Sequence, residues 1–114
     1  GYVLCLKEKI IAYVAIVFSG EPAYNSIEGN WLSDQPYATL HRLAVANEMK
    51  RKGIATGLLK RVEVLAKVKD FASIRIDTND DNESMQRIIQ KSGYSYCGVI
   101  HYIRGSRLAY EKVF

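Results

Sequence analysis

The chain has 114 residues, of which 48% are hydrophobic and 25% charged. This composition is typical of a single globular domain with one core and excludes a disordered tail. The longest apolar run, residues 10–18, is shorter than the ~20 residues that cross a bilayer, so we expect no membrane association. No secretory leader is recognisable, and the two cysteines show no metal-ligand spacing, so we expect a cytoplasmic protein without a metal.

Sixteen Lys and Arg against twelve Asp and Glu give a formal net charge of +4. This excess suits an anionic ligand but is too small to predict nucleic-acid binding by itself. The basic residues concentrate at residues 50–52, directly before Gly53, and acidic residues gather at residues 77–83. Because an aromatic-basic RNA motif is also absent from the sequence, we expect no nucleic-acid partner.

The first part of the chain predicts three strands. Residues 2–6 and 10–18 are rich in β-branched and aromatic residues and are joined by a short polar segment, which is typical of an antiparallel hairpin. Residues 19–35 have turn residues and no clean period, so we expect a long loop before a third strand at residues 37–45. The aromatic and acidic residues of this loop suit a cationic amine or, alternatively, a solvated loop with an anchoring Trp. They are Tyr24, Glu28, Trp31 and Asp34.

The second part predicts two helices and three strands. Apolar residues recur at helical spacing from Ile54 to about Lys69, and residues 73–77 form a short strand. A second helix begins near residues 80–82 and ends at Gly93. Two strands follow, residues 94–103 and 107–113, joined across residues 104–106. The order β-β-β-α-β-α-β-β predicts an α+β fold for residues 1–114, with a mixed sheet and helices packed on it.

The segment between the third strand and the first helix predicts an anion site. The first turn of a helix leaves backbone N–H groups unpaired, and the helix dipole adds partial positive charge there. Gly53 and the small Ala55 leave room for a phosphate to approach the backbone. The segment is neither a Walker loop nor a dinucleotide-binding loop, so a plain helix start with exposed basic residues remains the alternative.

Two motifs in this order resemble a known family. Lys50-x-x-Gly53-x-Ala55 resembles the Arg/Gln-x-x-Gly-x-Gly/Ala signature of the GNAT superfamily of acetyl-CoA-dependent N-acetyltransferases. Residues 82–85 together with residues 89–94 resemble that family's Asn-x-x-Ala…Tyr-x-Lys-x-Gly-Phe block. Residues 73–78 and 107–110 are similar to small bacterial members of the family. The resemblance implies a mixed, mostly antiparallel sheet flanked by helices.

The resemblance also implies a reaction and a cofactor. An amine of a small molecule or peptide attacks the thioester of acetyl-CoA directly in a ternary complex, without a metal. Loop amides hold the pyrophosphate, strand backbone holds the pantetheine arm, and the Val45 N–H stabilises the oxyanion. The residues expected to bind the cofactor are Leu43, Val45, Lys50, Arg51, Lys52, Gly53, Ile54, Ala55, Thr56, Asn82 and Met85. For Asn82, a helix cap is an alternative or an additional role.

Two side chains are candidates for moving protons. His41 matches a histidine of arylalkylamine N-acetyltransferases that takes part in removing the amine proton, and a half-buried structural histidine is the alternative. Tyr110 is the first candidate for protonating the departing thiolate, and a tyrosine that only packs on the sheet is the alternative. Tyr94, Tyr96 and Tyr102 are further candidates, whereas His101 is expected at the surface.

The sequence departs from the family pattern in three places. Lys50 replaces Arg or Gln, and Ile89 stands where many members have the tyrosine that protonates the thiolate. The chain also begins at what corresponds to the second strand of the family. We therefore expect the first strand and two helices to be missing, and the open sheet to be covered, for example in a homodimer. An acyl-CoA-binding module with little or no turnover is the alternative function.

Overall fold

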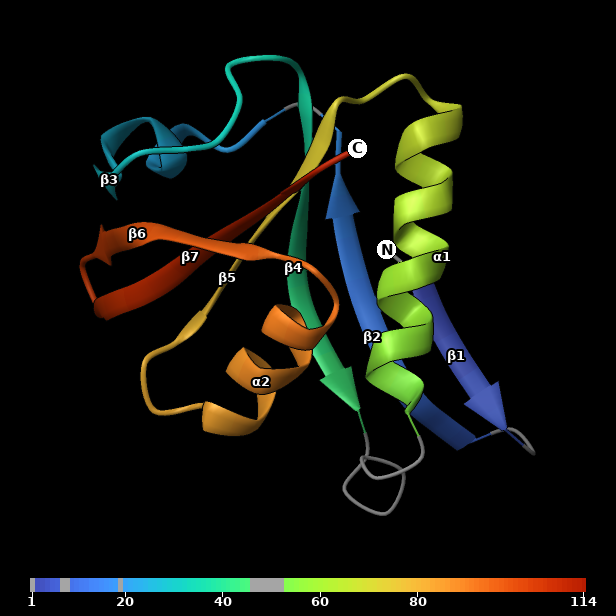
Figure 1. Cartoon of the computed structure of the whole chain (residues 1–114). Coiled ribbons are helices and arrows are strands. Elements are labelled where there is room, and N and C mark those ends of the chain that lie inside the picture. Colours follow the sequence, from blue (N-terminus) through green and yellow to red (C-terminus); the bar gives the residue numbers. More distant parts are fainter. Residues whose placement is uncertain (1, 7–8, 19, 46–52) are drawn as a thin grey trace.

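The computed structural model describes residues 2–6, 9–18, 20–45 and 53–114, with the backbone alone described for residues 2–15 and 41–45 within those ranges. They form a sheet of seven strands in the order β1-β2-β4-β5-β7-β6-β3, shown in Figure 1. The strands are β1 (Tyr2–Leu6), β2 (Lys9–Val17), β3 (Glu28–Gly29), β4 (Tyr37–Val45), β5 (Ser73–Asn79), β6 (Ser95–Tyr102) and β7 (Gly105–Val113). The helices are the 3-10 helix η1 (Pro22–Ser26), α1 (Ile54–Val68) and α2 (Glu83–Lys91).

The sheet is antiparallel except at its centre. β1 pairs with β2, and β2 with β4, in antiparallel register, and the same holds for β5 with β7, β7 with β6, and β6 with β3. β4 and β5 are parallel, because the connection between them passes through α1 and crosses back over the sheet. The α+β fold class expected from the sequence is confirmed.

Both α-helices pack on one face of the sheet. The buried stripe of α1 includes Leu58, Leu59 and Val62, and α2 contributes Ile89. They contact side chains of the central strands that alternate onto this face, among them Leu40 of β4 and Ile76 of β5, which are 1% and 2% exposed. This cluster is the main core, and its burial is the largest favourable contribution to folding.

The opposite face of the β5-β7-β6 half of the sheet is covered by the long connection between β2 and β4. Tyr24, in η1, is completely buried against Ile100 and Ala109, and Trp31 packs beside it with ring centroids 5.0 Å apart. The indole Nε1 of Trp31 donates a hydrogen bond to the Tyr24 carbonyl at 2.9 Å. The connection is therefore an ordered layer with its own small core.

Several details differ from the sequence-based expectations. The connection expected as an irregular loop contains η1 and the short strand β3, because Tyr24 and Trp31 anchor it to the sheet. The last hairpin turns at residues 103–104, with Gly105 and Ser106 already in β7, and β5 continues two residues further than expected. Other expectations are confirmed, since Asn82 caps α2 and Gly93 follows it with φ +95°.

No helix in the described ranges is long and apolar enough to cross a bilayer.

Candidate active site

The two parallel strands separate part of the way along their length. Their pairing runs from Tyr37 opposite Ser73 to Leu40 opposite Ile76, and it stops there. β4 continues to Val45 and β5 to Asn79, and Figure 1 shows the two strands diverging toward their carboxyl ends. Beyond Leu40, the edge of β4 that faces β5 is therefore not paired with it. We call this opening the β4–β5 split. An extended ligand can hydrogen-bond to a strand edge of this kind.

The other edge of β4 remains paired in the same region. His41 lies opposite Ala15, and Val45 lies opposite Ala12, both in β2. One edge of β4 is therefore paired with β2, whereas its other edge is not paired with β5 at the split. This arrangement places His41, Leu43 and Val45, all expected site residues, on the strand that borders the opening. Their side chains lie outside the described part of the structure.

The amino end of α1 has the features of an anion site. Gly53 is the N-cap with φ +70°, a left-handed conformation that glycine adopts without strain, and as a glycine it has no side chain to cap the helix. A Cβ at Gly53 would meet no atom of the described residues within 4 Å. The first hydrogen bond of the helix runs from Gly57 N–H to the Gly53 carbonyl at 3.0 Å. The N–H groups of residues 54–56 precede that bond and have no acceptor within the helix.

The split and this helix terminus lie at the same end of the molecule. Figure 1 shows the carboxyl end of β4 and the amino end of α1 together at the bottom of the view. Ala55 is 4% exposed and packs inward, whereas Ile54 and Thr56 are half-buried. The three expected cations, Lys50, Arg51 and Lys52, lie outside the described residues.

The α2 residues expected at the cofactor have structural contacts of their own. The Oδ1 atom of Asn82 accepts a hydrogen bond from Met85 N–H at 3.2 Å and so caps the helix. Met85 is half-buried and packs against the main core. Ile89 is fully buried in that core. These contacts explain both residues structurally, so the expected contact of Asn82 and Met85 with the cofactor stays a prediction.

The candidate proton donors differ in burial. Tyr110 is 1% exposed, its ring packs edge-on against Tyr96 at 5.7 Å, and burial raises its pKa while a hydrogen bond with Gln90 opposes the rise. Tyr94 is buried, and burial together with the charge of Glu63 raises its pKa. Burial, followed by the charge of Asp77, raises the pKa of Tyr102 to about 12. Tyr110 is thus a packed core residue in this structure, and its catalytic role stays a prediction.

A buried charged network lies on the loop-covered face and was not anticipated from the sequence. Arg75 Nε donates to Glu111 Oε2 at 3.1 Å, and the guanidinium lies over the rings of Trp31 and Tyr37, at 4.3 and 3.8 Å from their centroids. The other oxygen of Glu111 accepts from Leu32 N–H at 2.7 Å. This network fixes the loop to the centre of the sheet. The sequence did contain one indication of this network, because Arg75 is a charged residue between Ile74 and Ile76 in a strand expected to be buried.

A second network lies on the same face, at the first β5 residue beyond the last β4–β5 pair. The carboxylate of Asp77 accepts from Tyr24 Oη at 2.8 Å and from Arg107 Nε at 2.8 Å. Arg107 also donates to the Asn79 side chain at 2.8 Å. Each oxygen of the Asp77 carboxylate therefore has a donor, and the residue holds the hairpin against β5. Among the described residues, no group of three or more His, Cys, Asp or Glu side chains is arranged to hold a metal.

The arrangement of the sheet is shared with solved structures. An acetyltransferase of the GNAT family from Streptococcus agalactiae 2603 is 35% identical and superposes with a TM-score of 0.82 over 98% of this chain and 64% of that one. An N-acetyltransferase from Staphylococcus aureus Mu50, 20% identical, has a TM-score of 0.73 over 97% and 65% of the two chains. The aminoglycoside acetyltransferase AAC(6')-Ib in complex with coenzyme A is 22% identical, with a TM-score of 0.72 over 98% and 64%.

These three solved structures, all described as acetyltransferases, share the fold of this chain. The sequence model of the acetyltransferase (GNAT) family matches residues 1–94. The chain belongs to the GNAT family. It spans 64% of the length of the Streptococcus agalactiae relative. A comparison with curated protein sequences found no match.

Proposed function

We propose that this chain transfers an acetyl group from acetyl-CoA to a primary amine of a small molecule or peptide, by direct attack in a ternary complex. The observation that carries the proposal is the β4–β5 split beside the amino end of α1, where the N-cap is a glycine. Family membership supports it, as does the coenzyme A complex of a protein with the same fold. Together they supply a strand edge for an extended arm and backbone N–H groups for a phosphate.

The residues present fit this cofactor. No atom of the described residues fills the space at Gly53, so a phosphate there can reach the N–H groups of residues 54–56, and the positive end of the helix dipole favours its charge. The unpaired edge of β4 offers backbone groups at Leu43 and Val45 to the amides of the pantetheine arm. Acetyl-CoA supplies an activated acyl thioester when bound. The Val45 N–H is then the donor that stabilises the oxyanion formed by amine attack.

The chain must also move two protons. We assign His41 as the base that accepts the proton of the amine, directly or through a water molecule. Tyr110 is assigned as the donor to the thiolate, although this step is helpful rather than essential, because thiols have pKa values of about 8.5 and leave readily near neutral pH. Replacing Tyr110 by Phe separates this role from packing. A packing role predicts unchanged turnover and a small change in melting temperature.

One observation favours the alternative of an acyl-CoA-binding module. Ile89, at the position of the family's tyrosine, is fully buried, and the hydroxyl-bearing Tyr110 is 1% exposed. Neither side chain is placed at the surface of the described structure. If no other group accepts the amine proton or protonates the thiolate, we expect the chain to bind acetyl-CoA without turnover.

The experiment that tests the proposal is the release of free CoA thiol from acetyl-CoA in the presence and absence of an amine panel. We expect thiol release that depends on the amine and an acetylated product of the same amount by mass spectrometry. Binding of acetyl-CoA without amine-dependent release would support the binding module instead. Absence of binding by the folded protein would overturn both.

A further inference from the structure

Three polar side chains on adjacent strands form a chain of hydrogen bonds near the tip of the β6–β7 hairpin. The Oγ atom of Ser106, in β7, lies 2.9 Å from Nδ1 of His101, in β6. The other ring nitrogen, Nε2, lies 2.5 Å from Oε2 of Glu28, in β3. We call these three residues the serine cluster. A hydroxyl, an imidazole and a carboxylate in this order are the groups with which hydrolases activate a serine.

The Glu28 carboxylate decides which nitrogen of the imidazole carries the proton. An ionised carboxylate only accepts hydrogen bonds, so the proton of the neutral ring is on Nε2 and is donated to Glu28. Nδ1 is then the acceptor, and the Ser106 hydroxyl donates to it. In this arrangement His101 is oriented to remove the serine proton, which is the step that activates the nucleophile.

The backbone around the serine cluster is fixed by strand pairing. His101 lies directly opposite Ser106 in the β6–β7 register, and Glu28 lies opposite Val99, so Glu28 is a diagonal neighbour of His101. β3 approaches β6 closely, because a Cβ at Gly29 would collide with the backbone of β6. Strands position reactive side chains more precisely than loops do.

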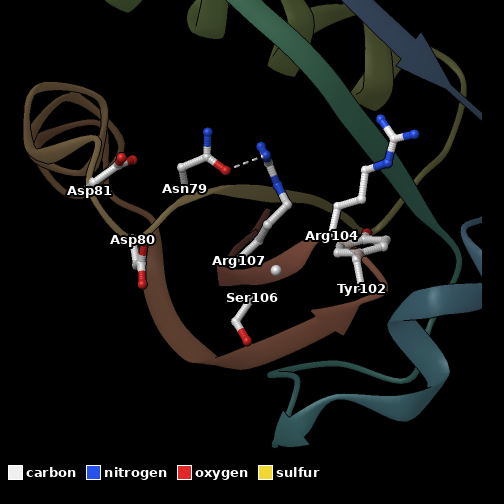
Figure 2. A pocket seen from close by; sticks show the side chains of 8 residues that line it. Asn79, Asp80, Asp81, Tyr102, Arg104, Ser106 and Arg107 are labelled. Atoms are coloured by element: carbon white, nitrogen blue, oxygen red, sulfur yellow. Dashed lines mark hydrogen bonds between the residues drawn. The ribbon is translucent and has the colours of Figure 1, made fainter.

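The serine cluster is separate from the charged networks of the loop-covered face. Ser106 and Arg107 both border a cavity of about 480 Å³ between the hairpin and the turn after β5. Figure 2 shows the Ser106 side chain directed away from Arg107, whose guanidinium donates to Asp77. Because successive residues of a strand point to opposite faces, the hydroxyl lies on the other face of β7. Ser106 is exposed there, and the side chains of His101 and Glu28 are 58% and 74% exposed, so a small molecule can reach the cluster from solution.

We propose that the serine cluster hydrolyses activated esters of small carboxylic acids, with Ser106 as the nucleophile. The Ser106 oxygen attacks the ester carbonyl and forms an acyl-serine, while its proton passes to His101 and from there to the departing alcohol. Water, deprotonated by the same imidazole, then releases the acid and restores the serine hydroxyl. This inference does not depend on acetyl transfer at the β4–β5 split.

The exposure of the serine cluster sets the class of ester. Electrostatic stabilisation is weaker in water than in an enclosed site, so the oxyanion of the tetrahedral intermediate is stabilised only weakly. Aryl esters have good leaving groups and need the least stabilisation, whereas peptides need much more. A short acyl group such as acetyl also needs no enclosed pocket. We therefore expect hydrolysis of aryl esters of short-chain acids and no cleavage of peptides.

The first test measures the hydrolysis of p-nitrophenyl acetate by the full chain. Ser106→Ala and His101→Ala should each lower the rate about 10²-fold, because they remove the nucleophile or its base. Glu28→Gln should lower it less, by about fivefold, because an exposed ion pair contributes little. Ser95→Ala is the matched control, since Ser95 is also an exposed serine of the hairpin strands, and its rate should be unchanged.

A second measurement identifies the nucleophile directly. The protein is treated with a fluorophosphonate, from which an activated serine oxygen displaces fluoride, and the labelled peptide is identified by mass spectrometry. We expect labelling at Ser106 that is lost in His101→Ala. Labelling at another residue, labelling that does not require His101, or unchanged hydrolysis in Ser106→Ala would overturn the inference.

Coenzyme A distinguishes this activity from the proposed acetyl transfer. Saturating coenzyme A should leave the hydrolysis of p-nitrophenyl acetate unchanged, because the serine cluster does not belong to the cofactor site. Inhibition by coenzyme A would place the hydrolysis at the β4–β5 split and would overturn the inference. Unchanged melting temperatures of the variants confirm that each remains folded.

Discussion

The guanidinium of Arg75 and the carboxylate of Glu111 form an ion pair at 3.1 Å in which the side chains are only 6% and 0% exposed. The pair lies on neighbouring strands, β5 and β7, at positions directly opposite in the register. Glu111 also accepts hydrogen bonds from Ser73 Oγ in β5 and from the N–H groups of Leu32 and Ser33, in the loop that covers this face. The network thus connects the centre of the sheet with residues 31–37, which otherwise have few regular hydrogen bonds.

Replacing Glu111 by Ala should lower the free energy of unfolding by about 3–5 kcal/mol, because it leaves the buried charge of Arg75 and the loop N–H groups without their acceptor. Urea unfolding followed by circular dichroism measures the change. The matched control is Glu83→Ala, whose carboxylate is 80% exposed and lies 3.8 Å from Arg87. That change should cost no more than about 0.5 kcal/mol. Similar losses for both variants would contradict the importance of the network.

The stability of the fold should decrease in the alkaline range. Burial, and then the charge of Asp77, raises the pKa of Tyr102 to about 12, and burial also raises the pKa values of Tyr24 and Tyr94. A tyrosine that ionises less readily in the folded state contributes its full stability below pH ~10, the pKa in the unfolded chain, and loses it as the pH rises through the folded value. Urea unfolding between pH 9 and 12 should therefore show a falling free energy.

The comparison for this prediction is Tyr102→Phe. Phenylalanine cannot ionise, so this variant should lose less stability than the parent protein over the same pH interval. A free energy of unfolding that stays constant up to pH ~12 in the parent protein would show that these phenols are not protected in the folded state.

Gly53→Ala should weaken coenzyme A binding and lower the melting temperature slightly. The left-handed conformation at φ +70° is strained for alanine by roughly 1–2 kcal/mol, and its Cβ would fill the space above the helix terminus. Gly93→Ala is the matched control, because Gly93 has φ +95° and lies at the carboxyl end of α2. Both variants should lose stability, but only Gly53→Ala should lose the thermal shift caused by coenzyme A. An equal shift in the two would place the phosphate elsewhere.

His41→Ala should lower turnover by roughly 10²-fold and leave the affinity for acetyl-CoA almost unchanged, because the imidazole is proposed to act on the amine. The rate of the parent protein should decrease toward acid pH as the imidazole becomes protonated. This acid limb should be absent from the variant. A structural histidine would instead lower the melting temperature, with activity following the folded fraction. The same pH profile in both proteins would exclude His41 as the base.

Much of the fold was predictable because its elements have local signals. The apolar stripe of α1, the cap at Asn82 and the glycine at residue 93 are read from neighbouring residues, and the structure has all three. The 3-10 helix at residues 22–26 was not predicted, because it depends on the long-range hydrogen bond from Tyr24 to Asp77. Likewise, strand patterns do not reveal where the pairing of β4 and β5 ends.

Less of the candidate site than of the fold was predictable from the sequence. The motif around Gly53 located the helix terminus, and the structure gives that glycine a left-handed conformation, whereas its role in cofactor binding stays a prediction. Tyr110 was chosen from its place in a motif, whereas its burial follows from alternation against the packed side chains of β5 and β6. The serine cluster was not recognised in the sequence, since only the strand order β7-β6-β3 brings Ser106, His101 and Glu28 together.

The most direct test of the cofactor site is a titration of the ¹⁵N-labelled protein with coenzyme A, followed by amide NMR. The account predicts saturable shifts concentrated at the amides of Leu43, Val45 and residues 53–56, with a smaller effect at Asn82. Shifts confined to the β6–β7 hairpin, or no saturable binding by the folded protein, would contradict it.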